Sequence, residues 1–423
     1  MEKSGLIVGI QEKPSRIGQW IVLSLQHVFA MFGATVLVPI ITGLDVGVAL
    51  VASGIGTLIY ILCTKAKVPV YLGSSFAYIP AISAAVASAS GAGSAYLGLM
   101  VVGLIYVIVA FIIRFAGSGW LKKLLPPVVI GPMIIIIGMT LAPVAIQTAG
   151  FDGKSGWQIP LVAFVTFLTV VILSIKAKGF LRIVPFIVAI LVGYVFAVIL
   201  GVVNLAESFK GVSFLSLPNF TFVGAYPFDF SAILMFAPIA FVTIAEHIGD
   251  HTVLGEICDK DFITDPGLDK TLLGDGIATF VSAAIGGPAN TTYGENTGVV
   301  AVTRVGSVWV TGLAACFAVL LGFFGYVQAF VSSIPWAVIG GMTIVLYGLI
   351  AANGVKILIK DKTDLSQMKN LVIVSAMLVI GLGGAVIPIV SGVSKIDGMS
   401  LAAIIGIVLN QFILLLEKLG SKK

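Results

Sequence analysis

The chain has 423 residues, of which 59% are hydrophobic and only 10% are charged. Because soluble globular proteins carry roughly 25% charged residues, this composition excludes an ordinary soluble protein and indicates an integral membrane protein surrounded by lipid. The formal net charge of +5 comes from basic loops beside apolar segments, so it predicts no nucleic-acid partner.

Fourteen apolar segments follow one another along the chain, separated by short Gly, Pro, Ser or charged breaks. A transmembrane helix needs about 20 mostly apolar residues, and several of these segments are too short or too polar to be plain helices. The pattern predicts an all-α polytopic membrane protein. In chain order, we expect the segments at residues 17–41, 46–63, 69–88, 95–115, 126–147, 157–175, 182–203, 229–249, 271–286, 289–303, 307–331, 335–353, 368–388 and 397–416.

Lysine and arginine residues gather on one side of this predicted topology. With the amino terminus inside, only Lys154, Lys210 and Lys395 fall on the opposite side, which leaves 24 − 3 = 21 basic residues on the inner side. Cytoplasmic loops carry such an excess. The distribution therefore predicts fourteen spans in the cell membrane, with both termini cytoplasmic.

An internal repeat divides the predicted spans into two sets of seven. Residues 126–136 read PPVVIGPMIII and residues 335–345 read PWAVIGGMTIV, which is 335 − 126 = 209 positions later. A starting proline and an internal glycine recur at the same spacing, in the fifth and twelfth segments. Because seven is an odd number, the second copy enters the membrane from the opposite side, as in many secondary transporters. We therefore expect two inverted seven-span repeats.

The third and tenth segments contain matching breaks rich in Gly, Ser and Thr, at residues 71–76 (YLGSSF) and 290–295 (NTTYGE). Irregular backbone at membrane depth is tolerated only where protein or a water-filled cavity satisfies its polar groups. Inverted-repeat transporters bind substrate near the midplane at discontinuous segments of this kind. We expect short antiparallel strand-like breaks here, which would offer free backbone N–H groups to a ligand. Packing is the usual role of a membrane aromatic, but the repeat places Phe76 and Tyr347 near this region.

Two carboxylates and two histidines lie close together in the eighth segment. Glu246 and Asp250 are four residues apart, so they share one face of a helix, and His247 and His251 form a neighbouring pair. Three roles fit this cluster: polar packing at a helix end, a metal site, or a substrate and proton site. Packing suits the histidines, since we expect the helix to leave the membrane near Gly255. Too few further ligands are present for a metal site, whereas the cost of a carboxylate in lipid favours a functional role for Glu246.

Glu295 is a second carboxylate at membrane depth, where the tenth segment resumes as a helix after Gly294. Two roles are open to it, and they do not exclude each other: ligand contact, and capping of the helix amino terminus, where a negative charge is favoured. Asn296 fits a contact role and a scaffold role equally well. For Gln26 and His27, in the first segment, local hydrogen bonding between helices is favoured.

Residues 295–304, ENTGVVAVTR, resemble the signature of the nucleobase-ascorbate transporter family, in which an acidic or amide residue and Asn precede x-Gly-x4-Thr and a basic residue. The chain also resembles the bacterial uracil permeases of that family at SLQHVFAMFGATVLVP, YLGSSFAY, IAEHIGD, NTTYGENTG and GGMTIVLYG. These motifs stand in the family's order over essentially the full chain, so the resemblance is specific.

The resemblance implies a proton-coupled symporter that takes up uracil by alternating access, with no cofactor besides the coupling proton. It also implies a homodimer. Each subunit would have a core domain, made of residues 1–124 and 229–332, and a gate domain, made of residues 125–228 and 333–423.

The resemblance further assigns a binding site residue by residue. Glu246 and Glu295 would bind the pyrimidine ring through their carboxylates, and the backbone amides of Phe76 and Gly294 would bind its carbonyl oxygens. Tyr347 would close over the ring from the gate domain. We expect supporting roles for Ser75, Tyr293 and Asn296, and proton coupling through Glu246 with Asp250 or His251.

Asp250 departs from the uracil pattern, which can carry histidine there, and agrees with xanthine and urate members of the family. Those members usually begin the signature with Gln, where this chain has Glu295. Because Glu295 is the residue expected to touch the ligand, uracil is favoured over xanthine, urate or another nucleobase. Two carboxylates disfavour an anion transporter of the same architecture, and the sequence offers no nucleophile–base pairing to support an enzyme.

Overall fold

The computed structural model describes residues 5–87, 91–182, 184–226, 230–390, 394–396 and 398–420. The elements of the first half are α1 (Ile17–Thr42), α2 (Val46–Cys63), β1 (Leu72–Ser74), the 3-10 helix η1 (Phe76–Tyr78), α3 (Ile79–Val86), α4 (Gly91–Ala116), α5 (Gly119–Leu124), α6 (Pro127–Thr140), α7 (Ala142–Thr148), α8 (Gln158–Lys176), η2 (Gly179–Arg182), α9 (Pro185–Ile199) and α10 (Leu205–Ser208).

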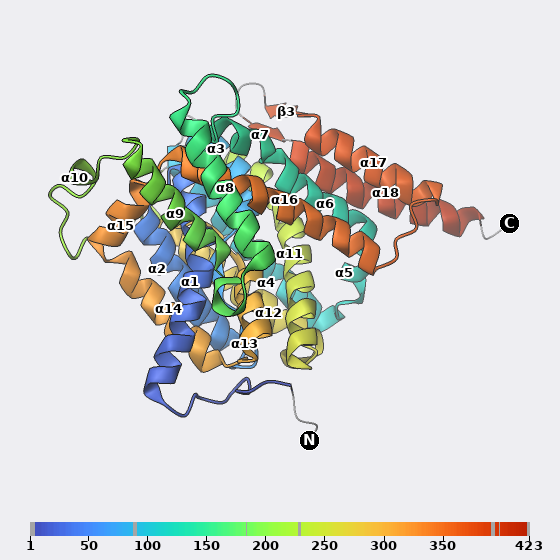
Figure 1. Cartoon of the computed structure of the whole chain (residues 1–423). Coiled ribbons are helices and arrows are strands. Elements are labelled where there is room, and N and C mark those ends of the chain that lie inside the picture. Colours follow the sequence, from blue (N-terminus) through green and yellow to red (C-terminus); the bar gives the residue numbers. More distant parts are fainter. Residues whose placement is uncertain are drawn as a thin grey trace.

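The elements of the second half are α11 (Phe230–Cys258), η3 (Ile263–Gly267), α12 (Leu268–Ala284), β2 (Asn290–Thr292), α13 (Gly294–Thr303), α14 (Val308–Gly322), α15 (Gly325–Ser332), α16 (Trp336–Lys360), α17 (Met368–Leu382), β3 (Ile387–Val390), β4 (Ser394–Ile396) and α18 (Gly398–Gly420). The helices form one packed body, from which α17 and α18 project at one side (Figure 1).

Long apolar helices dominate the described part of the chain. Seven are long and apolar enough to cross a membrane, at residues 17–42, 46–63, 91–116, 127–148, 158–176, 336–360 and 398–419. Shorter apolar helices lie at residues 76–86, 185–199, 308–322 and 368–382. The expectation of a mostly helical, multi-pass membrane protein is confirmed at this level.

Several element boundaries differ from those expected. The helix expected at residues 229–249 continues to Cys258, because neighbouring helices bury the histidines of its last turns. The segment expected at residues 307–331 is interrupted at Phe323 and Phe324 and becomes two helices. The boundaries expected at residues 88, 229 and 397 lie outside the described residues.

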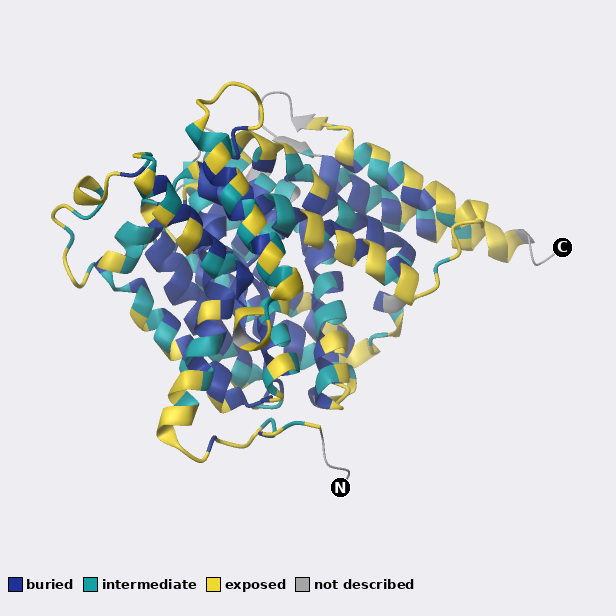
Figure 2. Ribbon diagram, viewed as in Figure 1, coloured by how far each residue is buried: buried dark blue, intermediate teal, exposed yellow. Residues whose placement is uncertain are grey.

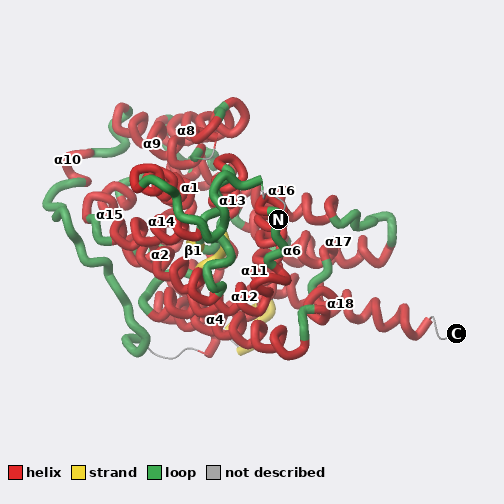
Figure 3. Tube along the Cα trace, turned by 90° about the horizontal axis from the view of Figure 1, so that it is seen from below, coloured by secondary structure: helices red, strands yellow, loops and turns green. Residues whose placement is uncertain are grey.

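Strands β1 and β2 form a short antiparallel ribbon, with Leu72 opposite Thr292. Figure 3 shows β1 surrounded by helices. The first residue of each strand donates its backbone N–H to a threonine in the preceding helix. Thr57 Oγ1 accepts a hydrogen bond of 2.9 Å from Leu72 N, and Thr279 Oγ1 accepts one of 3.2 Å from Asn290 N. These side chains satisfy backbone groups of the buried ribbon, as irregular backbone within a membrane protein requires.

The helices pack in two groups. In the first group, α2 packs against α12 and α14, α12 packs against α4, and α1, α11 and α13 adjoin them. In the second, α16 packs against α6, α7, α8 and α9, and α17 packs against α6 and α18. Buried residues concentrate in the middle of the molecule, and many residues of the projecting helices are exposed (Figure 2). Large apolar side chains are among these exposed residues, as expected for faces that meet lipid.

Close backbone approaches hold the second group together. A Cβ on Gly341 of α16 would lie 2.1 Å from Ala163 O of α8, and a Cβ on Gly138 of α6 would lie 2.4 Å from Tyr347 O of α16. A carbonyl oxygen within a helix cannot yield without moving the helix, because protein interiors are close-packed. Glycine is therefore required at both crossings.

Gly341→Ala is expected to destabilise the protein by about 1–3 kcal/mol, the usual cost of overpacking, and thus to lower the midpoint of thermal unfolding in detergent. Gly348→Ala, on the same helix, is the matched control, because a Cβ there meets no atom within 4 Å. Its midpoint should stay unchanged or rise, since Ala favours helix over Gly. Equal midpoints for the two variants would contradict the close contact between α16 and α8.

Candidate functional site

Four polar side chains occupy two turns of α11. Glu246 and Asp250 are half-buried, whereas His247 and His251 are fully buried. Helix α11 packs against α4, α12, α13, β2 and η1. It also packs against α6 and α18 of the second group, so these side chains lie where the two helix groups adjoin.

Glu246 lies within a group of carboxylates. Asp250, Asp275 of α12 and Glu295 of α13 are close enough for their charges to act on Glu246. Asp250 Oδ2 accepts a hydrogen bond of 2.5 Å from Thr292 Oγ1, which joins α11 to the ribbon. Four neighbouring carboxylates repel one another when ionised, and charge at membrane depth is costly. Such a group favours bound protons or a ligand that donates hydrogen bonds.

Two helices begin beside this group, each directly after the ribbon. Helix α13 starts at Gly294, following Tyr293 in extended conformation, and Glu295 stands in its first turn. The 3-10 helix η1 starts at Phe76, following Ser75 in extended conformation. The first backbone N–H groups of a helix have no intrahelical partner. Gly294 is exposed and a Cβ there would meet no atom within 4 Å, so the start of α13 is open to a ligand.

Ser75, Tyr293 and Asn296 build the surroundings of these helix starts. The Tyr293 hydroxyl donates to Ser74 O at 2.9 Å, and Asn296 Nδ2 donates to His27 O at 3.1 Å. The same Nδ2 lies 3.1 Å from Nδ1 of the His27 ring, which confirms the hydrogen bonding between helices that was expected for this side chain. Ser75 Oγ and Asn296 Oδ1 are buried and have no hydrogen-bond partner within the described ranges, which leaves both atoms available for a ligand or water.

Tyr347 lies in the second group of helices, on α16. Its side chain is 2% exposed, and its hydroxyl has no hydrogen-bond partner in the part of the chain that the structure describes. The structure brings Glu246, Glu295 and the starts of η1 and α13 together through α11. Tyr347 lies apart from these residues in the chain's packing, on α16 of the second helix group.

His247 and His251 each have a buried partner on another helix. His247 Nδ1 lies 2.8 Å from Asp275 Oδ2. His251 Nδ1 donates to His247 O at 2.7 Å, and its Nε2 bonds the hydroxyl of Tyr60 on α2. The sequence suggested that the histidines pack at a helix end. They pack inside the molecule instead, because α11 continues to Cys258.

Sequence reasoning did not single out Asp275 or Tyr60. Asp275 is the single charged residue in the apolar run LLGDGIATF. An ionisable residue inside an apolar span marks a functional position by default, so the sequence could have indicated Asp275. A lone tyrosine near the end of an apolar helix carries no comparable signal.

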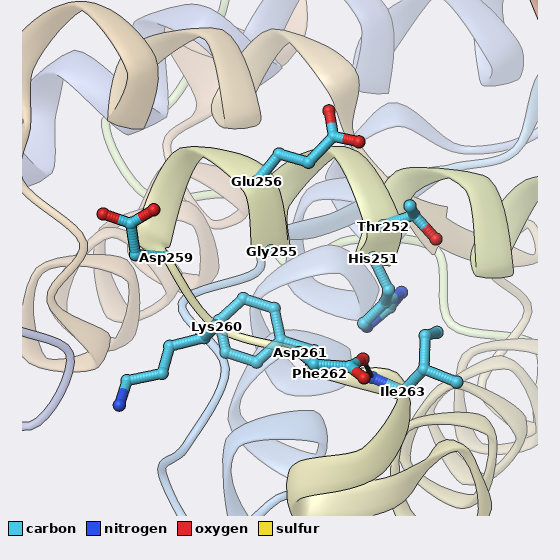
Figure 4. Close-up of a pocket in the computed structure, with 9 residues that line it drawn as sticks. All are labelled: His251, Thr252, Gly255, Glu256, Asp259, Lys260, Asp261, Phe262 and Ile263. Atoms are coloured by element: carbon cyan, nitrogen blue, oxygen red, sulfur yellow. Dashed lines mark hydrogen bonds between the residues drawn. The ribbon is translucent and has the colours of Figure 1, made fainter. Parts of the chain in front are cut away.

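A cleft of about 360 Å³ opens beyond His251, at the far end of α11. Figure 4 shows His251 pointing from the helix toward the turn that carries Phe262 and Ile263. The other lining residues are Thr252, Gly255, Glu256, Asp259, Lys260 and Asp261. Neither Glu246 nor Glu295 lines this cleft, so it is separate from the carboxylate group.

Comparisons with known proteins cover nearly the whole chain. A family model named Xan_ur_permease and described as "Permease family" matches residues 18–390. The uracil permease of Bacillus caldolyticus is 48% identical over 409 residues, which are 96% of this chain and 94% of that protein. The uracil permease of Bacillus subtilis (strain 168) is 44% identical over 423 residues, with 97% and 96% covered.

Two solved structures are similar to the fold. The transmembrane domain of the cyanobacterium bicarbonate transporter BicA has a TM-score of 0.61 at 16% identity, covering 94% of this chain and 98% of that chain. The murine anion transporter Slc26a9, in the inward-facing state, has a TM-score of 0.69 at 9% identity, covering 96% and 69%. At these identities the likeness concerns the fold alone.

The matching relatives are named permeases, which are transporters and not enzymes. Fold and sequence therefore define a multi-pass membrane transporter. Within that class, the chain belongs to the permease family whose model spans residues 18–390.

Proposed function

We propose that this protein takes up uracil together with a proton, by alternating access. The observation that carries the proposal is that Glu246 and Glu295 lie close enough for their charges to interact, beside two helix starts. Uracil presents N–H donors, which suit carboxylates, and carbonyl oxygens, which suit free backbone N–H groups such as those of Phe76 and Gly294. Such a cycle needs no cofactor beyond the coupling proton.

The relatives support uracil as the substrate, because they are named uracil permeases and match nearly the full chain. Xanthine, urate or another nucleobase is the alternative substrate, favoured by Asp250 at the position where the uracil pattern can carry histidine. An anion is a weaker candidate. The fold resembles anion and bicarbonate transporters, but neighbouring carboxylates would repel an anionic substrate.

Each remaining site residue has a proposed role in this cycle. Glu246 binds the coupling proton, with Asp250 or His251 as its route. Tyr347 closes over the bound ring when the two helix groups approach. Ser75, Tyr293 and Asn296 support the helix starts, a role that agrees with their hydrogen bonds to the ribbon and to α1.

Fourteen spans in two inverted repeats would suit alternating access, and two correspondences support such a repeat. Helices α6 and α16 both begin after a proline in extended conformation, Pro126 and Pro335. Thr57 and Thr279 hold the first residues of β1 and β2 in the same manner. Corresponding features half a chain apart are what inverted-repeat transporters contain.

Two domains that move against each other complete the proposal. A core domain of residues 1–124 and 229–332 and a gate domain of residues 125–228 and 333–423 agree with the two helix groups that pack mainly among themselves. The excess of basic residues on one side supports cytoplasmic termini in the cell membrane. A homodimer is proposed from the resemblance to the nucleobase-ascorbate transporter family.

Uptake of radiolabelled uracil into proteoliposomes with an inward proton gradient tests the proposed function. We expect accumulation that a proton uncoupler abolishes and that unlabelled uracil inhibits more strongly than xanthine, urate or thymine. Stronger inhibition by xanthine or urate would assign a purine substrate instead. Flux of chloride or sulfate without uracil uptake would show that the protein is an anion carrier.

A further inference from the structure

The buried pair of His247 and Asp275 lies next to Glu246, where α11 packs against α12. Both side chains are fully buried, with 2.8 Å between Nδ1 and Oδ2. In the described part of the chain, neither lysine nor arginine pairs with Asp275. A buried carboxylate without a partner is strongly destabilising. His247 is therefore the side chain that can balance the charge of Asp275.

His247 also keeps one ring nitrogen free. Its Nε2, like Asp275 Oδ1, is buried without a hydrogen-bond partner among the described residues. Both nitrogens of His251 are occupied, by His247 O and by the Tyr60 hydroxyl. Because a backbone carbonyl only accepts, Nδ1 of His251 carries the hydrogen, and Nε2 of the neutral ring accepts from Tyr60. Of these two histidines, His247 is the one that can gain or lose a proton without breaking a hydrogen bond.

The charge of this pair reaches the carboxylates of the candidate site. Asp275 acts electrostatically on both Glu246 and Asp250. The ring of His251 stacks on His247 with 4.0 Å between centroids. The titratable groups that surround the pair are Tyr60 from α2, Tyr78 from η1, Tyr106 from α4, and Glu246, Asp250 and His251 from α11.

We propose that His247 and Asp275 form a proton-exchanging pair that sets the charge beside Glu246. With protons on both ring nitrogens, the His247 imidazolium balances the Asp275 carboxylate. When the site opens to water during alternating access and Nε2 releases its proton there, the pair carries one net negative charge, which stabilises the protonated form of Glu246. The pair is a positioning element that acts through Glu246 and not on the substrate. This inference rests on the proposed proton-coupled function.

The pH profile of uracil uptake in proteoliposomes tests the pair. We expect uptake to fall as the pH rises, and the midpoint is the pH at which it has fallen by half. Asp275→Asn removes the negative charge that stabilises protonated Glu246, so the midpoint should move to lower pH by about one unit or more, the size of effect that a neighbouring charge has. His247→Gln leaves a side chain that can donate to Asp275 but cannot take a proton, so the midpoint should move to higher pH. The double variant should have the same midpoint as Asp275→Asn, because without the Asp275 carboxylate there is no charge for His247 to balance.

Tyr194→Phe is the matched control for these variants. It removes a hydrogen bond of 2.7 Å to Ser333, between other helices, and should leave the midpoint unchanged. Slower uptake at an unchanged midpoint in all three pair variants would show that His247 and Asp275 are structural. A shift in Asp275→Asn without one in His247→Gln would show that Asp275 acts alone. Either outcome would contradict the proposal that His247 and Asp275 exchange a proton as a pair.

Wild-type protein supplies a second test that does not depend on folded variants. The chain has three histidines, so nitrogen NMR of protein labelled at histidine can resolve each ring. We expect one ring to change its charge over the pH range in which uptake falls, while the other two stay neutral. Three unchanged rings overturn the pair. Uracil uptake that ignores the proton gradient in wild-type protein would instead contradict the proposed function.

Discussion

Glu246→Gln is expected to abolish proton-driven accumulation of uracil while it retains much of the binding. Glutamine keeps the size of the side chain and one acceptor oxygen, but it cannot bind a proton. Glutamine resembles the neutral, protonated carboxyl that is proposed to bind together with uracil. At most one neutral hydrogen bond is lost, which contributes about 0.5–1.5 kcal/mol, so binding should weaken by about tenfold or less. Uptake with and without a proton gradient, together with equilibrium binding of labelled uracil, separates the two effects.

Glu207→Gln is the control for this variant, because Glu207 is exposed in α10 and lies outside the site. It should behave like the wild-type protein in both assays. If Glu246→Gln retained the pH dependence and the uncoupler sensitivity of the wild-type protein, Glu246 would not be the group that binds the coupling proton. Exchange of uracil without a gradient should persist in this variant, since exchange requires no net proton movement.

Glu295→Ala is expected to remove uracil binding in the concentration range used for the wild-type protein. A hydrogen bond to a charged group contributes about 1.5–3 kcal/mol, which corresponds to a loss of affinity of about 10- to 150-fold. The position supports this size of effect, since Glu295 stands in the first turn of α13 beside the open backbone of Gly294. Equilibrium binding of labelled uracil in detergent measures it directly.

Glu295→Gln distinguishes ligand contact from capping of α13. An amide keeps an acceptor oxygen for the ligand but loses the negative charge that favours a helix amino terminus. We expect Glu295→Gln to bind uracil more weakly than the wild-type protein and more strongly than Glu295→Ala, with similar thermal stability in all three. A large fall in thermal stability with unchanged uracil affinity would assign Glu295 to capping alone.

The helical segments were largely predictable because a membrane span is a local property of the sequence. The expected segment at residues 46–63 coincides with α2, and the one at residues 157–175 lies within one residue of α8. Each rests on about 20 consecutive apolar residues. The prediction failed where polar residues continue a helix inside the protein, as at the end of α11, because hydropathy cannot distinguish a buried polar turn from a loop.

The candidate site was predictable in part, through residues whose type is costly at membrane depth. Glu246 and Glu295 stand out for this reason, and the structure brings their charges within range of each other. The binding and proton roles of these residues stay predictions until they are measured. The breaks at residues 71–76 and 290–295 predicted free backbone N–H groups, but only the family resemblance indicated which of them, at Phe76 and Gly294, would bind the ligand.

By itself, the sequence determined that this chain is a membrane transporter of the permease family, because composition, apolar segments and family motifs are all read along the chain. Only the tertiary structure decided which polar groups meet. His247 contacts Asp275, which is 28 residues away along the chain, and Tyr60 contacts His251, which is 191 residues away. A buried side chain at membrane depth has no bulk water to bond, so its partner across the interior depends on which helices pack together, and only the tertiary structure determines that packing.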